Sequence, residues 1–223
     1  MTFEFDHLFV MTDQGAEVAD RLLALGFVQG ISRVHPGQGT TNRCFFFQNA
    51  MLEFLWVHNS AEAQFEGIQR THLWERWRDR NSGICPFGIC LRPTADSVRT
   101  IAFDYWDYSP PYMPENLSFA VGNNSEILTE PMFFQTPFGK RPDQQPIEKR
   151  VPFVHPIGIQ EITRLELVSP MADYPSPEMR SVLETGQLKL RFGEEYWIEL
   201  GFDGESQGEH IDFRPEIPLI INW

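Results

Sequence analysis

The chain has 223 residues, 42% of them hydrophobic and 13% aromatic, which is enough to bury one large core or two smaller ones. Its 18 Lys and Arg against 31 Asp and Glu give a net charge of -13, which opposes nucleic-acid binding because such binding depends on cationic side chains. No secretory signal and no stretch of roughly 18 apolar residues is seen. With only 3 cysteines, we expect a cytoplasmic protein with free core thiols that binds neither nucleic acid nor membrane.

Residues 1–58 have the pattern of a βαβββ unit. Apolar residues at helical spacing predict a helix that begins near Thr12 or Asp13 and ends at Gly26, where a left-handed cap fits. A hairpin is expected to turn at residues 48–50. The strands of this unit are expected over residues 3–10, 27–34, 42–47 and 51–57.

The rest of the chain repeats this outline. The predicted segments are a helical connector over 59–83, a second, divergent βαβββ unit over 84–135, a proline-rich crossing segment over 136–157, and a C-terminal βαββ unit with an acidic tail over 158–223. In the second unit we expect a short helix carrying Val98 and Ile101. In the last unit, Ser176 begins a helix, and residues 188–192 and 196–202 form a hairpin.

An internal repeat of this kind predicts an α+β fold. The repeated βαβββ units would form curved mixed sheets around a cleft, with helices on the outer face. Along the first strand, Phe5, His7 and Phe9 alternate with Leu8 and Val10. If Leu8 and Val10 pack under the helix, the other three side chains must face the cleft.

The same parity argument applied to the strand at 51–57 sends Glu53 into the cleft beside His7. An imidazole and a carboxylate on one face are a ligand set that divalent iron, manganese, nickel and zinc accept. In the more conservative interpretation, His7 is a sheet histidine paired with a carboxylate, and Glu53 is the ion-pair partner of Arg43 or Arg164.

Four runs resemble the glyoxalase-like branch of the vicinal oxygen chelate superfamily: FDHLFV at 5–10, LGF at 25–27, GTTNR at 39–43 and MLEFL at 51–55. The resemblance implies that His7 and Glu53 are metal ligands and that the protein forms a homodimer. The superfamily takes two further ligands from another unit. Here the C-terminal unit has Arg164 and Glu199 at the corresponding positions, and the second unit offers only Glu130.

The first hypothesis is therefore a lyase, isomerase or dioxygenase whose divalent metal ion is held by His7, Glu53 and Glu199 and polarises a small-molecule substrate. Glu53 or Glu199 would also serve as a general base. The residues expected to contact the substrate are Asn42, Arg43, Phe9, Phe47 and Arg164.

The second hypothesis is a metal-free protein that binds or sequesters a small molecule. Arg164 supports it, because an arginine cannot ligate a metal but can hold an anionic compound. His35, which precedes Pro36 and Gly37, is interpreted as a loop tip or as part of a mobile lid. A third possibility is self-association through the helix carrying Trp74 and Trp77.

Overall fold

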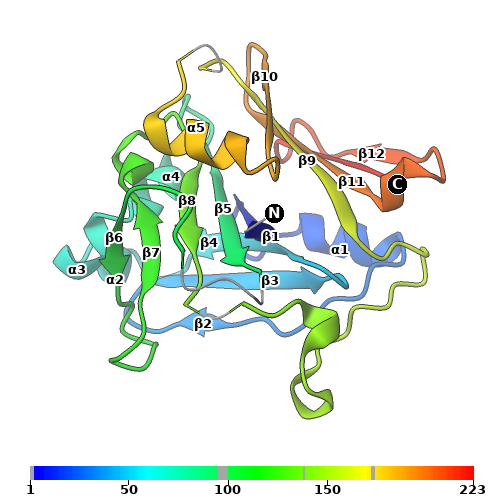
Figure 1. Ribbon diagram of the computed structural model, residues 1–223, viewed down its shortest axis with the longest axis horizontal. Coiled ribbons are helices and arrows are strands. Elements are labelled where there is room, and N and C mark those ends of the chain that lie inside the picture. Colours follow the sequence, from blue (N-terminus) through cyan, green and yellow to red (C-terminus); the bar gives the residue numbers. More distant parts are fainter. Residues whose placement is uncertain (1–2, 95–99, 138, 172–173) are drawn as a thin grey trace.

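The computed structural model describes residues 3–94, 100–137, 139–171 and 174–223, and these form two mixed sheets (Figure 1). The larger sheet curls strongly and has eight strands in the order β2-β3-β4-β1-β5-β8-β7-β6. The smaller sheet has five strands in the order β10-β9-β11-β13-β12. The predicted α+β class with curved mixed sheets is confirmed.

The strands of the larger sheet are β1 (Phe3–Met11), β2 (Val34–His35), β3 (Thr40–Phe46), β4 (Met51–Val57), β5 (Phe87–Pro93), β6 (Tyr105–Tyr108), β7 (Phe119–Gly122) and β8 (Met132–Gln135). Those of the smaller sheet are β9 (Ile162–Ser169), β10 (Lys189–Phe192), β11 (Trp197–Phe202), β12 (His210–Asp212) and β13 (Leu219–Asn222). The α-helices are α1 (Val18–Ala24), α2 (Ser60–Ala63), α3 (Glu66–Gln69), α4 (Leu73–Arg78) and α5 (Pro177–Glu184). Four short 3-10 helices are η1 (Asn123–Glu126), η2 (Pro142–Gln144), η3 (Ile147–Lys149) and η4 (Asp203–Glu205).

The larger sheet contains two related halves. In the first half β1 pairs parallel with β4, and in the second half β5 pairs parallel with β8. Antiparallel pairing of β1 with β5 joins the halves in the middle of the sheet. The helix expected to carry Val98 falls outside the described residues.

Two local predictions for the first unit are wrong. Helix α1 begins at Val18 rather than near Thr12, because the Thr12 amide still donates to the carbonyl of Leu55 and so continues the pairing of β1 with β4. Of the strand expected over residues 27–34, only Val34 is extended in a sheet. The amide of Val28 donates instead to the ring of His155, which lies outside any sheet.

The C-terminal part also differs from its prediction. Strands β10 and β11 do not form a hairpin, since they lie on opposite sides of β9. Helix α5, capped by Ser176 as predicted, carries the chain across the sheet between β9 and β10, and such a crossover produces the parallel β9–β10 pair. Residues 210–222, expected within an acidic tail, contain β12 and β13.

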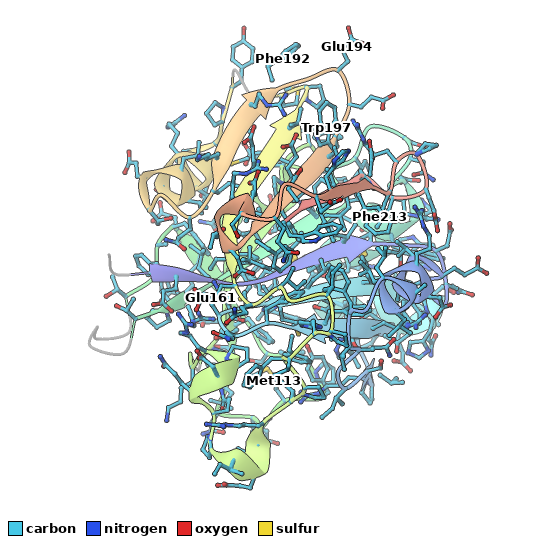
Figure 2. All side chains as sticks on the ribbon, turned by 90° about the vertical axis from the view of Figure 1, so that its right-hand side faces the viewer. Met113, Glu161, Phe192, Glu194, Trp197 and Phe213 are labelled. Carbon is cyan, nitrogen blue, oxygen red and sulfur yellow. The ribbon has the colours of Figure 1, made fainter. Side chains whose placement is uncertain are left out.

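One continuous core lies between the larger sheet and the smaller one. The face of the larger sheet that carries Leu8 and Val10, here called the outer face, packs on α1 and on inward residues of the smaller sheet such as Leu167 and Leu200. Figure 2 shows the smaller sheet stacked beside β1 on this side. The two sheets therefore share one hydrophobic core.

The opposite face of the larger sheet, here called the inner face, carries a separate apolar cluster. Phe9, Leu55 and Phe134 of the strands pack there with Ile68 and Leu73 from the short helices that follow β4. These helices consequently cover part of the inner face. Within the described residues, no helix has the length and apolar character needed to cross a bilayer.

His155 connects the proline-rich segment to the core and should make stability pH-dependent. Its Nδ1 accepts a hydrogen bond from the Val28 amide at 2.9 Å, and its Nε2 donates to the Phe46 carbonyl at 2.8 Å, so the ring must be neutral. Burial lowers the pKa of His155 below the ordinary value of 6.5. The unfolded chain therefore binds this proton first, and the contribution of His155 is present above pH 6.5 and lost as the pH falls through the lowered pKa.

We expect the urea midpoint of the wild type to fall between pH 7.5 and pH 5 by more than that of a His155→Phe variant, which cannot take up the proton. The variant should be less stable at both pH values because it leaves the Val28 amide and the Phe46 carbonyl unpaired. Replacing the exposed His210 by Phe is the control. Equal pH dependence in the wild type and in His155→Phe would contradict this assignment.

Candidate functional site

A β-bulge in β1 decides which side chains reach the inner face. Against β5 the register shifts between Phe5 and His7, which leaves Asp6 as an extra residue. Phe5 consequently packs into the outer core, whereas His7 contacts Phe134 of the inner cluster. The prediction that Phe5 shares a face with His7 is wrong for this reason.

The bulge also brings Asp6 beside the His7 ring. The Nδ1 of His7 lies 2.7 Å from Asp6 Oδ1, and because a carboxylate can only accept, this nitrogen carries the proton. Asp6 Oδ2 accepts in turn from the buried Arg92 at 3.2 Å, and Arg92 also pairs with Glu4. The second ring nitrogen of His7, Nε2, is thereby left as the lone-pair donor.

Burial acts against the charged forms of both groups, but their mutual hydrogen bond outweighs it. The pKa of Asp6 is lowered by His7 and Arg92 despite burial. The pKa of His7 is raised, because the hydrogen bond and charge of Asp6 and the charge of Glu53 together exceed the effect of burial. The surroundings of His7 therefore favour a positive charge at this ring.

Glu53 reaches the same place from β4. It is 6% exposed, and its Oε2 lies 3.9 Å from His7 Nε2. Its other oxygen, Oε1, accepts a 2.6 Å hydrogen bond from Asn42 Nδ2, while Asn42 Oδ1 accepts from the amide of Arg33 at 2.7 Å. Strand parity placed His7 and Glu53 on one face, and the structure brings their side chains together with that of Asn42, a residue expected to contact a substrate.

His35 approaches Glu53 from the other side. Its Nε2 lies 3.5 Å from Asn42 Nδ2, and its Nδ1 lies 2.8 Å from Thr40 Oγ1. Its ring stacks on Tyr112, with centroids 5.0 Å apart and planes inclined by 27°. Burial lowers the pKa of His35, so the ring is neutral at pH 7. His35 therefore belongs to the site.

Tyr112 comes from the second unit, in the loop between β6 and β7. The same loop approaches Gly37 through Pro111, and Tyr108 at its start donates to Gln38 at 2.8 Å. Burial, together with the charge of Glu53, raises the pKa of Tyr112. This loop thus covers the site where the chain of the first unit turns at residues 36–39.

The strands of the second unit contribute apolar groups to the site. Within the described part of β5 and β8, the inner cluster receives Cys90, Met132 and Phe134. Ligand atoms of Cys90, Asp6 and His7 lie within 4.8 Å of one another, and burial raises the pKa of the Cys90 thiol well above its ordinary value.

Glu130, the carboxylate that the second unit offered in the sequence, lies elsewhere. It accepts from the amide and the hydroxyl of Ser176 at the start of α5, each at 2.6 Å. It also accepts from Asn124 at 2.9 Å. Its hydrogen bonds therefore hold α5 against the second unit.

Glu199 and Arg164 form a separate polar cluster on the solvent side of the smaller sheet. Glu199 accepts from Arg164 at 3.1 Å and from Arg191 at 2.8 Å, and Arg164 also pairs with Glu166. In Figure 2, Trp197 of the Glu199 strand lies near the top, far from Met113 near the bottom, which follows Tyr112 in the chain. The structure does not bring Glu199 to the His7 site.

Of the residues expected to contact a substrate, Phe9 and Asn42 face the inner side and two others do not. Arg43 points to the outer face, where it pairs with Asp20 at 2.7 Å. Phe47 is buried in the outer core, with its ring 4.6 Å from that of Phe202. Arg43 and Phe47 each lie an odd number of residues from Asn42 along the chain. In an extended chain such residues point to the opposite face, so strand alternation directs both away from the inner face.

Comparison with known proteins agrees with this architecture. Residues 5–99 match a family model described as a glyoxalase-like domain. A crystal structure of a hypothetical protein from Staphylococcus aureus is similar to this chain, with a TM-score of 0.56, 11% sequence identity and 99% of each chain covered. At this identity the likeness shows a common fold alone. No curated protein matches the chain.

Proposed function

We propose that this protein, whose residues 5–99 match a family model described as a glyoxalase-like domain, is an enzyme of the vicinal oxygen chelate superfamily that binds a divalent metal ion through His7 and Glu53 and acts on a small molecule. The observation that carries the proposal is the 3.9 Å separation of His7 Nε2 from Glu53 Oε2. Nitrogen and oxygen ligands each lie about 2.0–2.2 Å from a metal such as zinc, so one ion can reach both atoms.

The surroundings of the two ligands support the same proposal. His7 has its far nitrogen held by Asp6, and Glu53 has its far oxygen held by Asn42. Such outer partners orient metal ligands and set the tautomer of a ligating histidine. Asp6 and Glu53 also place two carboxylates around His7 against one buried cation, Arg92, which favours the entry of a cation.

A divalent ion at this place supplies Lewis-acid polarisation of oxygen atoms on a bound substrate. The protein itself holds the ligands in position, and Phe9 and Phe134 exclude water from one side of them. Glu53 is the carboxylate that remains as a candidate base, because Glu199 is engaged by arginines of the smaller sheet.

The proposal is tested by metal content. We expect the purified protein, loaded with Zn²⁺, Mn²⁺, Ni²⁺ or Fe²⁺ and then dialysed, to retain close to one ion per chain of at least one of these metals. His7→Ala and Glu53→Gln should abolish this retention. His210→Ala, which alters an exposed histidine of β12, should leave it unchanged. If the wild type retains no ion, or if His7→Ala retains as much as the wild type, the proposal fails.

The metal-free alternative loses its main support in the structure. Arg164, the cation expected to hold an anionic ligand, contacts the carboxylates of Glu166, Glu199 and Glu205. Its charge is therefore already balanced, and it belongs to the smaller sheet. Thermal stabilisation by a small molecule in metal-free protein would favour this alternative, since a ligand that binds only the native state raises apparent stability.

A further inference from the structure

A cavity of about 230 Å³ lies between helix α5 and the segment that leads into β6. Its apolar lining includes Ile101, Phe103 and Pro177. Its polar lining comes from Asp104, Glu178 and Ser181. Phe103 packs in the outer core, whereas His7 contacts the inner cluster, so this cavity is separate from the His7 site.

Glu178 is buried beside this cavity without a partner. Only 8% of the residue is exposed, yet its carboxylate makes no hydrogen bond or ion pair with any residue that the structure describes. Burying a carboxylate is unfavourable unless donors or a cation compensate its charge. None of the described residues that line the cavity is a lysine or an arginine. A cation that enters the cavity therefore meets an uncompensated negative charge.

The start of α5 does not account for this carboxylate. The Oγ of Ser176 caps the helix by accepting from the Met179 amide at 3.0 Å, and the Ser176 amide and hydroxyl each donate to Glu130 at 2.6 Å. Glu130 thus already supplies the negative charge that a helix N-terminus favours. Glu178 has no capping hydrogen bond of its own, so its carboxylate is available to the cavity.

We propose that this cavity binds a small organic ammonium ion, such as a primary amine, through Glu178. Ser181 lies three residues further along α5 and therefore on the same side of the helix, where its hydroxyl can accept a second N–H of the ammonium group. Asp104, which is exposed, adds negative charge at the opening. The apolar lining packs against the carbon part of the ligand. The site is independent of the metal ion proposed at His7 and Glu53.

The lining suits an organic cation better than a metal ion. Mg²⁺ and Ca²⁺ take about six or more oxygen ligands, whereas much of this lining is apolar and cannot ligate. The volume of about 230 Å³ is several times the roughly 30 Å³ that one water molecule occupies in the liquid. It is also below the roughly 300–1,000 Å³ of pockets that hold drug-sized ligands. A compact amine therefore fits the space.

Isothermal titration calorimetry of the full chain with benzylamine tests the proposal. We expect saturable binding of benzylamine and much weaker binding of benzyl alcohol, which has nearly the same shape but no charge. Glu178→Gln should weaken benzylamine binding by roughly tenfold or more, since a hydrogen bond to a charged group contributes at least that factor. In the nitrogen-15 spectrum of the wild type, benzylamine should shift the amide signals of Glu178 and Ser181. These shifts locate the site even if Glu178→Gln folds poorly.

The matched control is Glu184→Gln, which makes the same change at the exposed last residue of α5 and should leave the benzylamine affinity unchanged. Absence of benzylamine binding by the wild type would overturn the proposal. So would equal affinity of the wild type and Glu178→Gln, or equal binding of benzyl alcohol and benzylamine. Displacement of benzylamine from the wild type by Ca²⁺ would show a site for an inorganic cation instead. None of these outcomes bears on metal binding at His7 and Glu53.

Discussion

Arg76→Met is expected to lower the free energy of unfolding by about 3–5 kcal/mol, because it breaks a buried charged network. The Arg76 side chain is fully buried. Its NH1 donates to the carbonyls of Cys85 at 3.0 Å and Glu130 at 2.6 Å, and its NH2 donates to that of Ser125 at 3.3 Å. Methionine fills much of the volume but leaves three carbonyls without this donor and the buried Glu130 without its nearby cation.

Urea denaturation followed by circular dichroism measures this effect. Arg78→Met is the control, since Arg78 lies two residues further along α4 and is exposed, and its guanidinium pairs with the neighbouring Asp79 and lies over the ring of Trp74. Exposed pairs of this kind contribute at most about 1 kcal/mol, so Arg78→Met should be nearly neutral. Similar losses in the two variants would show that Arg76 acts through helix propensity rather than through its hydrogen bonds.

Gly39→Ala is expected to lower the free energy of unfolding by about 2–5 kcal/mol, because it combines an unfavourable backbone conformation with a steric clash. Gly39 has a φ of +76°, and an added Cβ would collide with the carbonyl oxygen of Asn59 and lie 2.6 Å from the amide nitrogen of Ala63. Both are backbone atoms, which cannot swing aside. The Gly39 carbonyl also accepts from the amides of His58 and Asn59, so displacement of Gly39 would disturb the start of α2.

Gly83→Ala separates the two contributions. Gly83 has a φ of +83°, but nothing lies within 4 Å of an added Cβ, so only the backbone term remains, at about 1–2 kcal/mol. Chemical denaturation of both variants gives the difference. If Gly39→Ala costs no more than Gly83→Ala, the turn at residues 36–39 is not packed against α2 as tightly as the structure shows.

The central pair of the site could be predicted from strand alternation alone. Leu8 and Val10 are apolar and belong under a helix, so His7 and Phe9 had to face the other way, and the same argument placed Glu53 beside them. These positions follow from the period of a strand, which is independent of tertiary structure. Accordingly, the side chains of His7 and Glu53 do meet, whereas the hydrogen bond from Asn42 to Glu53 is a finding of the structure.

The bulge at Asp6 could not be predicted in this way. Phe5 continues the apolar alternation of the sequence, and an extra residue becomes apparent only when a partner strand is in place. Because the bulge was missed, so were Asp6 as the partner of His7 and Arg92 behind it. A polar residue directly before the histidine was the only signal present in the sequence.

The other differences concern contacts between distant segments. His35 reaches Asn42 through a turn whose path depends on two glycines with positive φ, and Tyr112 stacks on the His35 ring from the second unit. In the sequence, strand alternation aligned Arg164 and Glu199 with the corresponding positions of the first unit. In the structure their side chains do share one face, but it is a face of the smaller sheet. What parity could not specify is that the last unit builds a second sheet, whose polar face points to solvent.

The shared core has a consequence for how the chain can vary. Along β1, neighbouring residues have different surroundings. Leu8 and Val10 pack on side chains that come from more than 150 residues later in the chain, whereas His7 and Phe9 lie against the inner cluster. Substitutions at alternate positions of a few strands would therefore change the inner face without weakening the packing between the two sheets. Conversely, replacements in the C-terminal third would weaken the molecule as a whole while His7 and Glu53 kept their identity.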